Sequence, residues 1–240
     1  MGTVRLGRHA SEQLSRLNLS WRQGEHVLVT GGTGSGKTAL VRHLAQLRLD
    51  RGGSVVVFVA KLQPDKTITD YYRGWTRWKT WKDRPSLTDN RIIFWPDVEG
   101  KSADAAVEIM RREYAHALGE ISKVGKWTVI IDEGLFTTSP HGLNLSGTIA
   151  NMYQLIRSGH GTMITLAQRP AHLPLAIYAN ISHAFIGQAK EGVDLKRLGD
   201  LDSHLSARQM QAMISANGKH DFLWIPVSNG GAPERLNLAR

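Results

Sequence analysis

The chain has 240 residues, a formal net charge of +9 and no cysteine. The length fits one α/β domain, or one domain with a modest appendage, and the lack of cysteine excludes disulfides and cysteine-ligated metal sites. We expect a cytoplasmic protein, because no apolar run could span a membrane and the first 20 residues lack the apolar core of a secretory signal. The positive charge favours a polyanionic partner, with nucleic acid as the first candidate and a merely basic surface as the alternative.

A glycine-rich loop follows the first predicted strand, at residues 25–30. This strand is rich in apolar and β-branched residues, and residues 39–47 after the loop have a helical pattern that continues to about Leu49. The loop fits the phosphate-binding pattern G-x-x-x-x-G-K-[ST] with Gly31, Gly32, Thr33, Gly34, Ser35, Gly36, Lys37 and Thr38. Its backbone N–H groups and the helix N-terminus would hold a phosphate. We expect ATP as the ligand, with Lys37 on the β/γ-phosphates and Thr38 on Mg²⁺; the alternative is a glycine turn before an ordinary helix.

Strands and helices alternate along the rest of the chain. Further strands are predicted at residues 54–60, 92–95, 127–131, 162–167, 182–186 and 221–225, and helices at 103–123, 147–158 and 207–215. Residues 1–24 form a lead-in with a short helix near 11–17, and residues 226–240 form a tail rich in Pro, Gly and Asn. The alternation predicts a RecA-like α/β domain, with a mostly parallel central sheet and helices on both faces. Ligands bind such sheets at the carboxyl ends of the strands.

Residues 61–84 form an insert that is both basic and aromatic. Seven Lys and Arg residues are interleaved with two tyrosines and three tryptophans, whose spacing of three predicts one face of a helix. Three interpretations stay open: packing in the core or at a subunit interface, contact with nucleic acid, and docking to a capsid or membrane surface.

Two carboxylates end the strand predicted at residues 127–131. Asp132 is placed to hold the Mg²⁺ shell, as in a Walker B strand, and Glu133 to polarise the attacking water; an acidic turn is the alternative. The 95 residues from Lys37 to Asp132 leave room for two more strands. This spacing, with a glutamate after the aspartate, is typical of the additional-strand, catalytic-glutamate P-loop ATPases.

A strand at residues 162–167 ends in Gln168-Arg169-Pro170, after a helix that closes with Arg157. The neutral amide of Gln168 is suited to sensing the γ-phosphate or orienting the water. With residues 174–185, this pattern resembles the FtsK–HerA superfamily of DNA-pumping ATPases over about residues 25 to 190. The resemblance implies a ring in which an arginine reaches the neighbour's nucleotide. By position that arginine is Arg157, with Arg169 as the second candidate and a solvated helix-end arginine as the alternative.

In size, the chain resembles the single-domain genome-packaging ATPases of tailless icosahedral viruses with an internal membrane, which belong to this superfamily. The resemblance implies ATP-driven translocation of double-stranded DNA by a homo-oligomeric ring, a pentamer or hexamer, in the host cytoplasm and at the virion vertex. Capsid or viral membrane proteins are then further partners. The alternatives are a plasmid or conjugative DNA-transfer ATPase, and a nucleotide-switched assembly protein that does not move DNA.

Two other patterns carry no site. The histidines at positions 141, 160, 172, 183 and 204 lack metal-ligand spacing, and are interpreted as surface or packing residues. Residues 143–147 (LNLSG) resemble an ABC transporter signature, but that signature precedes the Walker B strand, whereas this stretch follows it. We therefore interpret it as a loop.

Overall fold

The fold is built on one nine-stranded sheet, seen in a computed structural model that describes residues 12–15, 17, 21–63, 65–83, 89–199, 201, 205–228 and 230–238. Seven strands run parallel, in the order β3-β4-β2-β5-β6-β1-β7, and β8 and β9 extend the sheet antiparallel beside β7. The strands are β1 (His26–Thr30), β2 (Ser54–Phe58), β3 (Thr76–Trp78), β4 (Arg91–Phe94), β5 (Trp127–Ile131), β6 (Thr162–Ala167), β7 (Ile181–Ile186), β8 (Asp221–Ile225) and β9 (Glu234–Asn237).

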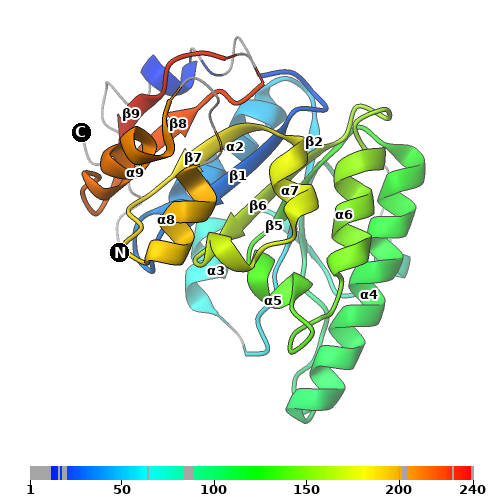
Figure 1. The fold of residues 1–240 in the computed structure, drawn as a ribbon. Helices are drawn as coiled ribbons and strands as arrows, with labels where there is room; N and C mark the ends of the chain where they lie inside the picture. Colours follow the sequence, from blue (N-terminus) through cyan, green and yellow to red (C-terminus); the bar gives the residue numbers. More distant parts are fainter. Residues whose placement is uncertain are drawn as a thin grey trace.

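Helices cover both faces of the sheet, which confirms the predicted α/β fold. In Figure 1, α4, α6 and α7 lie in front of the sheet and α2 lies behind it. Because both faces are covered, the central strands are apolar throughout, and every residue of β1 and β6 is buried. The α-helices are α2 (Lys37–Asp50), α3 (Lys66–Tyr71), α4 (Ala103–Val124), α5 (Gly134–Thr138), α6 (Ser146–Leu155), α7 (Leu175–Asn180), α8 (Gly192–Gly199) and α9 (Ala207–Ser215), and the 3₁₀ turns are η1 (Trp81–Asp83) and η2 (Pro170–His172).

The position of β6 determines how the site is assembled. It lies between β1, which leads into the P-loop, and β5, which ends before Asp132. This position confirms the prediction of an extra strand between the P-loop strand and the strand that ends before Asp132. Because the three strands are parallel, the P-loop, Asp132 and Gln168 all emerge at the same edge of the sheet.

The insert differs from the predicted tryptophan-bearing helix. It consists of the six-residue α3, the edge strand β3 and the turn η1, with Gly74 at a φ of +85° between α3 and β3. Trp78 and Trp81 are 5% and 3% exposed, and Trp81 packs edge-on against Phe94 at 5.5 Å between ring centroids. The helix prediction is wrong because β3 pairs with β4 and turns Trp78 into the core. These two tryptophans are core residues and are not available to stack on bases.

Both end segments contain regular secondary structure among the described residues. Residues 12–15 and 17 are helical, with Leu14 and Leu17 buried, and the rest of the helix predicted near 11–17 lies outside the described residues. The predicted tail contains β9, whose register with β8 pairs Leu236 with Phe222. Among the described residues, none of the helices has the length and apolar character that crossing a membrane requires.

Candidate nucleotide-binding site

The P-loop connects β1 to the first turn of α2, as the sequence predicts. Lys37 is the first residue of α2, and its Nζ donates to the carbonyl oxygens of Gly31 at 2.7 Å and Gly32 at 2.9 Å. Gly36 has a φ of +102°, in the left-handed region where a side chain is strained. The lysine thus lies folded over the loop that would hold the phosphates.

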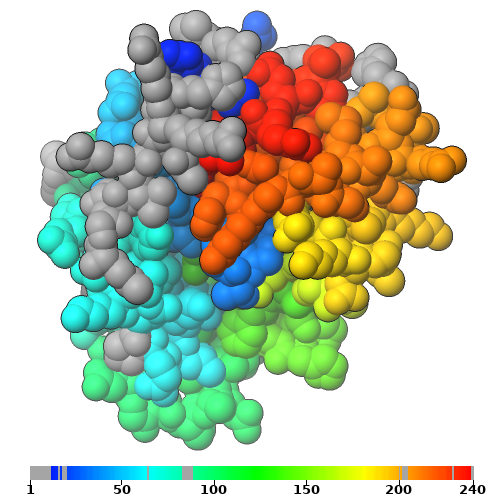
Figure 2. All heavy atoms as spheres, turned by 90° about the vertical axis from the view of Figure 1, so that its left-hand side faces the viewer, coloured from blue at the N-terminus to red at the C-terminus, as the bar shows by residue number. Residues whose placement is uncertain are grey.

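The C-terminal hairpin packs directly on this loop. A Cβ atom on Gly36 would lie 2.9 Å from Cδ1 of Leu238, and Nδ1 of His220 lies 3.3 Å from the carbonyl oxygen of Ser35. In Figure 2 the blue segment that contains the P-loop lies beside the orange segment around the start of β8. The Pro, Gly and Asn content of the residues after β8 predicts a tail and gives no signal for this contact. Gly36 therefore meets two requirements, a positive φ and close packing against Leu238.

Asp132 and Glu133 follow β5 at the same edge. The backbone N–H of Asp132 donates to the carbonyl of Phe58 at 3.2 Å, which continues the β2–β5 pairing up to the site. Burial raises the pKa of Asp132 to about 6, against the opposing charge of Lys61. Burial also raises the pKa of Glu133, and Lys61 and Lys37 oppose that shift.

The charged side chains at this edge shift one another's pKa values. Burial lowers the pKa of Lys37, while Glu133 and Asp132 act in the opposite direction. Two carboxylates and two lysines thus influence one another across the ends of β1, β2 and β5. The sequence pattern places Lys61 only in the basic insert, not at the nucleotide edge. Its position just beyond β2, the neighbour of β5, was the signal that could have placed it at this site.

Gln168 connects the P-loop with the Walker B strand. Oγ1 of Thr33 donates to Oε1 of Gln168 at 3.1 Å, and Nε2 of Gln168 lies 3.5 Å from Oε2 of Glu133. The amide therefore lies between the phosphate loop and the carboxylate expected to polarise water. This is the location from which a side chain can respond to a γ-phosphate.

Arg157 lies at the opposite edge of the sheet from its own P-loop. It is exposed, its carbonyl accepts from the N–H of His160 at 3.0 Å, and it packs against Gly24, just before β1. The five residues of β1, at about 3.3 Å each, separate this edge from the P-loop by roughly 15 Å. The geometry therefore does not bring Arg157 to the nucleotide site of its own subunit.

Arg169 lies at the nucleotide edge but is already paired. Its Nε donates to Oδ2 of Asp194 at 3.0 Å, and the Asp194 side chain is only 4% exposed. Of the predicted site residues, the structure thus brings together the P-loop, Asp132, Glu133 and Gln168, and leaves Arg157 apart.

The histidines form no metal site in the described part of the chain. His183 is buried, with Nε2 lying 3.3 Å from Oε2 of Glu25, whereas His141, His160 and His172 are exposed. His204 lies outside the described residues. Within the stretch 143–147, Leu143 to Leu145 lie in a loop, and α6 begins at Ser146.

This fold and this edge define a P-loop NTPase. The family model described as ABC transporter matches residues 14–135, which are 122 of the 240 residues, and the chain belongs to this family of ATP-binding domains. The matched region runs from the N-terminal segment through the P-loop to just past Asp132 and Glu133, and ends before the stretch 143–147. No curated protein matches the sequence.

Comparison with solved structures adds the fold around that region. The genome-packaging NTPase B204 of Sulfolobus turreted icosahedral virus 2, in complex with AMPPCP, is similar with a TM-score of 0.63 and 14% identity, covering 90% of this chain and 98% of that one. VirB4 of Thermoanaerobacter pseudethanolicus is similar with a TM-score of 0.62 and 9% identity, covering 89% and 88%. The pCW3 conjugation coupling protein TcpA is similar with a TM-score of 0.50 and 18% identity, covering 92% of this chain and 60% of that one. The chain therefore shares the fold of these proteins.

Proposed function

We propose that the chain hydrolyses ATP and uses the energy to move double-stranded DNA, as the packaging motor of a viral genome. The observation that carries the proposal is the Thr33–Gln168–Glu133 contact chain, which links the phosphate loop to the carboxylate. The likeness to B204 over nearly the whole of both chains supports packaging in particular, because that protein is described as a genome-packaging NTPase.

The residues at the edge have distinct roles in this proposal. The P-loop N–H groups and Lys37 bind and orient the β- and γ-phosphates. The carboxylate of Glu133, held beside Gln168, accepts a hydrogen bond from the attacking water and polarises it. Gln168 orients that water without adding charge.

The donor set fits Mg²⁺. The hydroxyl of Thr38 and the carboxylate of Asp132 are hard oxygen ligands, which this cation prefers. Burial raises the pKa of Asp132 to about 6 although Lys61 and Lys37 lower it, so these lysines compensate the burial only in part, and a divalent cation would complete that compensation. Thr38 and Asp132 would hold Mg²⁺, which supplies charge neutralisation at the β- and γ-phosphates.

A ring of subunits explains where Arg157 lies. Since it is distant from its own P-loop and exposed, it is available only to a neighbour's nucleotide. Leu155, in the same exposed helix end, is 61% exposed, and Val124, at the end of α4, is 58% exposed. Exposed apolar residues around an arginine are the composition of a protein interface. We assign this edge to the contact with the next subunit.

The insert supplies the cations for DNA. Arg73, Arg77, Lys79 and Lys82 are exposed, and two of them form ion pairs, Arg73 with Asp70 at 3.1 Å and Lys79 with Asp97 at 2.6 Å. Exposed pairs of this kind contribute little to stability, so exchanging the carboxylate for a DNA phosphate costs little. With Trp78 and Trp81 buried, contact would be through phosphates, which suits a motor that must pass every sequence.

A conjugative DNA-transfer ATPase is the second candidate, because VirB4 matches the fold as well as B204 does. Both candidates predict the same biochemistry, and a pathway assay in the source organism would separate them. The nucleotide-switched assembly protein predicts ATP hydrolysis without any response to DNA.

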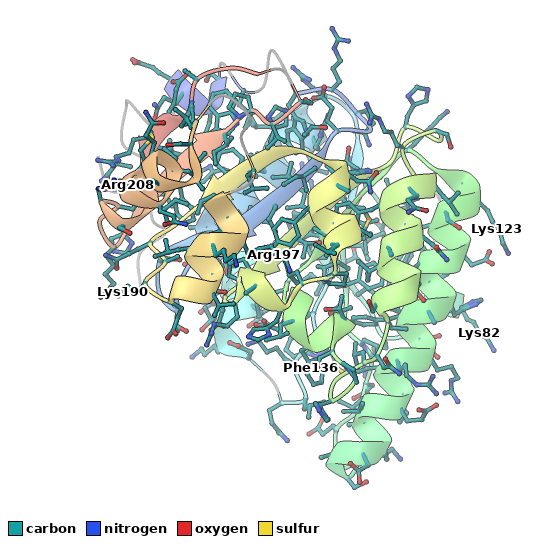
Figure 3. All side chains as sticks on the ribbon, in the orientation of Figure 1. Lys82, Lys123, Phe136, Lys190, Arg197 and Arg208 are labelled. Carbon is teal, nitrogen blue, oxygen red and sulfur yellow. The ribbon has the colours of Figure 1, made fainter. Side chains whose placement is uncertain are left out.

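The test is a titration of the ATPase rate with duplex DNA at several salt concentrations. We expect DNA to stimulate the rate, and the stimulation to weaken steeply as salt is added. The logarithm of the DNA affinity should fall with the logarithm of the salt concentration, with a slope of about −0.9 for each phosphate contacted. The quadruple Ala variant of Arg73, Arg77, Lys79 and Lys82 should keep its basal rate and show a flatter slope. A charge-matched control replaces four exposed cations outside the insert, namely Arg112 in α4, Lys190 just before α8, Lys196 in α8 and Arg208 in α9. Lys190 and Arg208 lie on the other side of the molecule from Lys82 in Figure 3.

Lys37→Ala, which removes the cation of the P-loop, should abolish turnover. Equal slopes for wild type and the insert variant would exclude the insert from the DNA path. Hydrolysis without DNA stimulation, in a verified ring, would favour the assembly protein.

A further inference from the structure

The turn that carries Gln168 is held by a buried carboxylate. Asp194, in the first turn of α8, accepts from Nε of Arg169 at 3.0 Å with Oδ2 and from the backbone N–H of Ala171 at 2.9 Å with Oδ1. Both oxygens of Asp194 thus accept hydrogen bonds from the turn that follows Gln168, one from Arg169 and one from Ala171. The side chain is 4% exposed, so these contacts are shielded from water.

A second element holds the same turn from α7. The hydroxyl of Tyr178 donates to the carbonyl of Pro170, between the two groups that Asp194 binds. The guanidinium of Arg197, which projects from α8 in Figure 3, lies 5.5 Å from the Tyr178 ring centroid. Three successive residues of the turn are therefore each held by one contact: Arg169 through its side chain, Pro170 through its carbonyl and Ala171 through its N–H.

Such an arrangement demands a reason, because burying a carboxylate is costly unless its charge and hydrogen bonds are satisfied. One reason is simply to attach α8 to the sheet. Another lies one residue upstream, where Gln168 makes contacts of 3.1 Å to Thr33 and 3.5 Å to Glu133. Contacts of this length fail when the backbone shifts by about 1 Å, so the turn must be rigid for the amide to work.

We propose that Asp194 is a positioning residue for ATP hydrolysis, which acts through Arg169 and Ala171 to fix Gln168 between the P-loop and Glu133. It touches no reacting group. The inference rests on the proposed ATPase function and adds to it the element that holds the γ-phosphate-sensing amide in place. It also assigns Arg169 to a pair within its own subunit.

The test compares Asp194→Asn with Glu191→Gln, which removes the same charge from an exposed position just before α8. Asparagine keeps the shape of the side chain, but it is uncharged and has only one acceptor oxygen, so it cannot accept hydrogen bonds from both Arg169 and Ala171 in this way. We expect kcat to fall by about ten-fold or more, while the KM for ATP and the affinity for ADP stay within about two-fold. Glu191→Gln should match wild type. An unchanged kcat in folded Asp194→Asn, or an equal loss in Glu191→Gln, would overturn the proposal.

A double-mutant cycle separates positioning from a structural role. If Asp194 acts through Gln168, then adding Asp194→Asn to Gln168→Ala should cause no further loss of kcat. Affinities for ATPγS and for ADP, measured by titration of a fluorescent nucleotide, should stay within about two-fold of wild type in both single variants, so that the loss lies in kcat. Additive losses in the cycle would assign Asp194 to stability alone and overturn the proposal.

If Asp194→Asn does not fold, Arg169→Gln and Tyr178→Phe decide the question by the same cycle. Each removes one contact to the turn, and each should lower kcat with KM retained and show no added loss with Gln168→Ala. Failure of the proposed function is recognised separately, because Glu133→Gln would then keep normal turnover. Loss of turnover in Glu133→Gln with an additive Asp194 cycle refutes only the positioning role.

Discussion

Replacing Asp132 by Asn should stabilise the nucleotide-free protein near neutral pH. The pKa of the Asp132 carboxyl is raised from 3.8 to about 6 by burial, with the nearby carboxylate of Glu133 adding to the effect and Lys61 opposing it. The folded state thus binds this proton more tightly than the unfolded chain. A difference of about two pKa units corresponds to a cost of about 3 kcal/mol for the ionised form, reduced by the partial exposure of the side chain. We expect Asp132→Asn to gain about 1–3 kcal/mol at pH 8.

The pH dependence gives the sign of this effect. Below about pH 4 the carboxyl is protonated in both states and costs nothing, between pH 4 and 6 the cost grows, and above pH 6 it is fully present. Urea unfolding in EDTA without nucleotide, at pH 8 and pH 4.5, measures the difference. The advantage of Asp132→Asn should fall by about half or more at the lower pH.

Asp97→Asn serves as the matched control, because the hydrogen bond from Lys79 lowers the pKa of that exposed carboxyl. Neutralising Asp97 should therefore give no gain at pH 8. With Mg²⁺ and ATPγS the order should reverse, since wild type binds the nucleotide complex and gains stability by linkage. An Asp132→Asn variant that is no more stable than wild type at pH 8, or equally more stable at both pH values, would refute the reasoning.

Three further predictions follow from the same edge, the insert and the opposite edge. Glu133→Gln should keep its nucleotide affinity and lose about 10²–10⁴-fold in turnover, measured by phosphate release; unchanged turnover would contradict its role. Trp81→Ala should lose about 3–5 kcal/mol in urea unfolding, because the ring is buried against Phe94; a much smaller loss with weakened DNA binding would return this residue to a DNA-contacting role. Arg157→Ala should be inactive alone and regain activity when mixed with Lys37→Ala subunits, which still donate their own arginine. Steady-state ATPase assays of the mixtures check this, and intact rings without rescue would count against a trans arginine.

The parts of the fold with strong local signals were predictable from the sequence. β5, β6, β8 and α9 have the bounds that the apolar runs and the helical pattern predicted. The P-loop, Asp132, Glu133 and Gln168 could be placed at one edge because carboxyl ends of parallel strands converge there. Local pattern and tertiary structure agree in these segments, since each strand is buried on both faces.

The remaining parts depend on contacts between distant segments, which a local pattern does not encode. The spacing of three between Trp75, Trp78 and Trp81 fits a helix, but pairing of β3 with β4 determines the conformation. Likewise, no periodicity predicts that Leu238 packs against Gly36, or that Asp194 binds the turn after Gln168 from 26 residues downstream. The closeness of Lys61 to Asp132 and Glu133 is not predictable from a local pattern either, because only the strand order brings β2 beside β5.

Displacement of a third strand from a DNA triplex tests the claim of ATP-driven translocation most directly. A duplex that carries a bound third strand is mixed with the assembled protein, and release of that strand is followed over time. We expect release with ATP and Mg²⁺, no release with ATPγS or with Glu133→Gln, and release that does not depend on the sequence of the duplex track. ATP hydrolysis at a normal rate without release of the third strand would contradict the motor and leave an ATPase that does not move DNA.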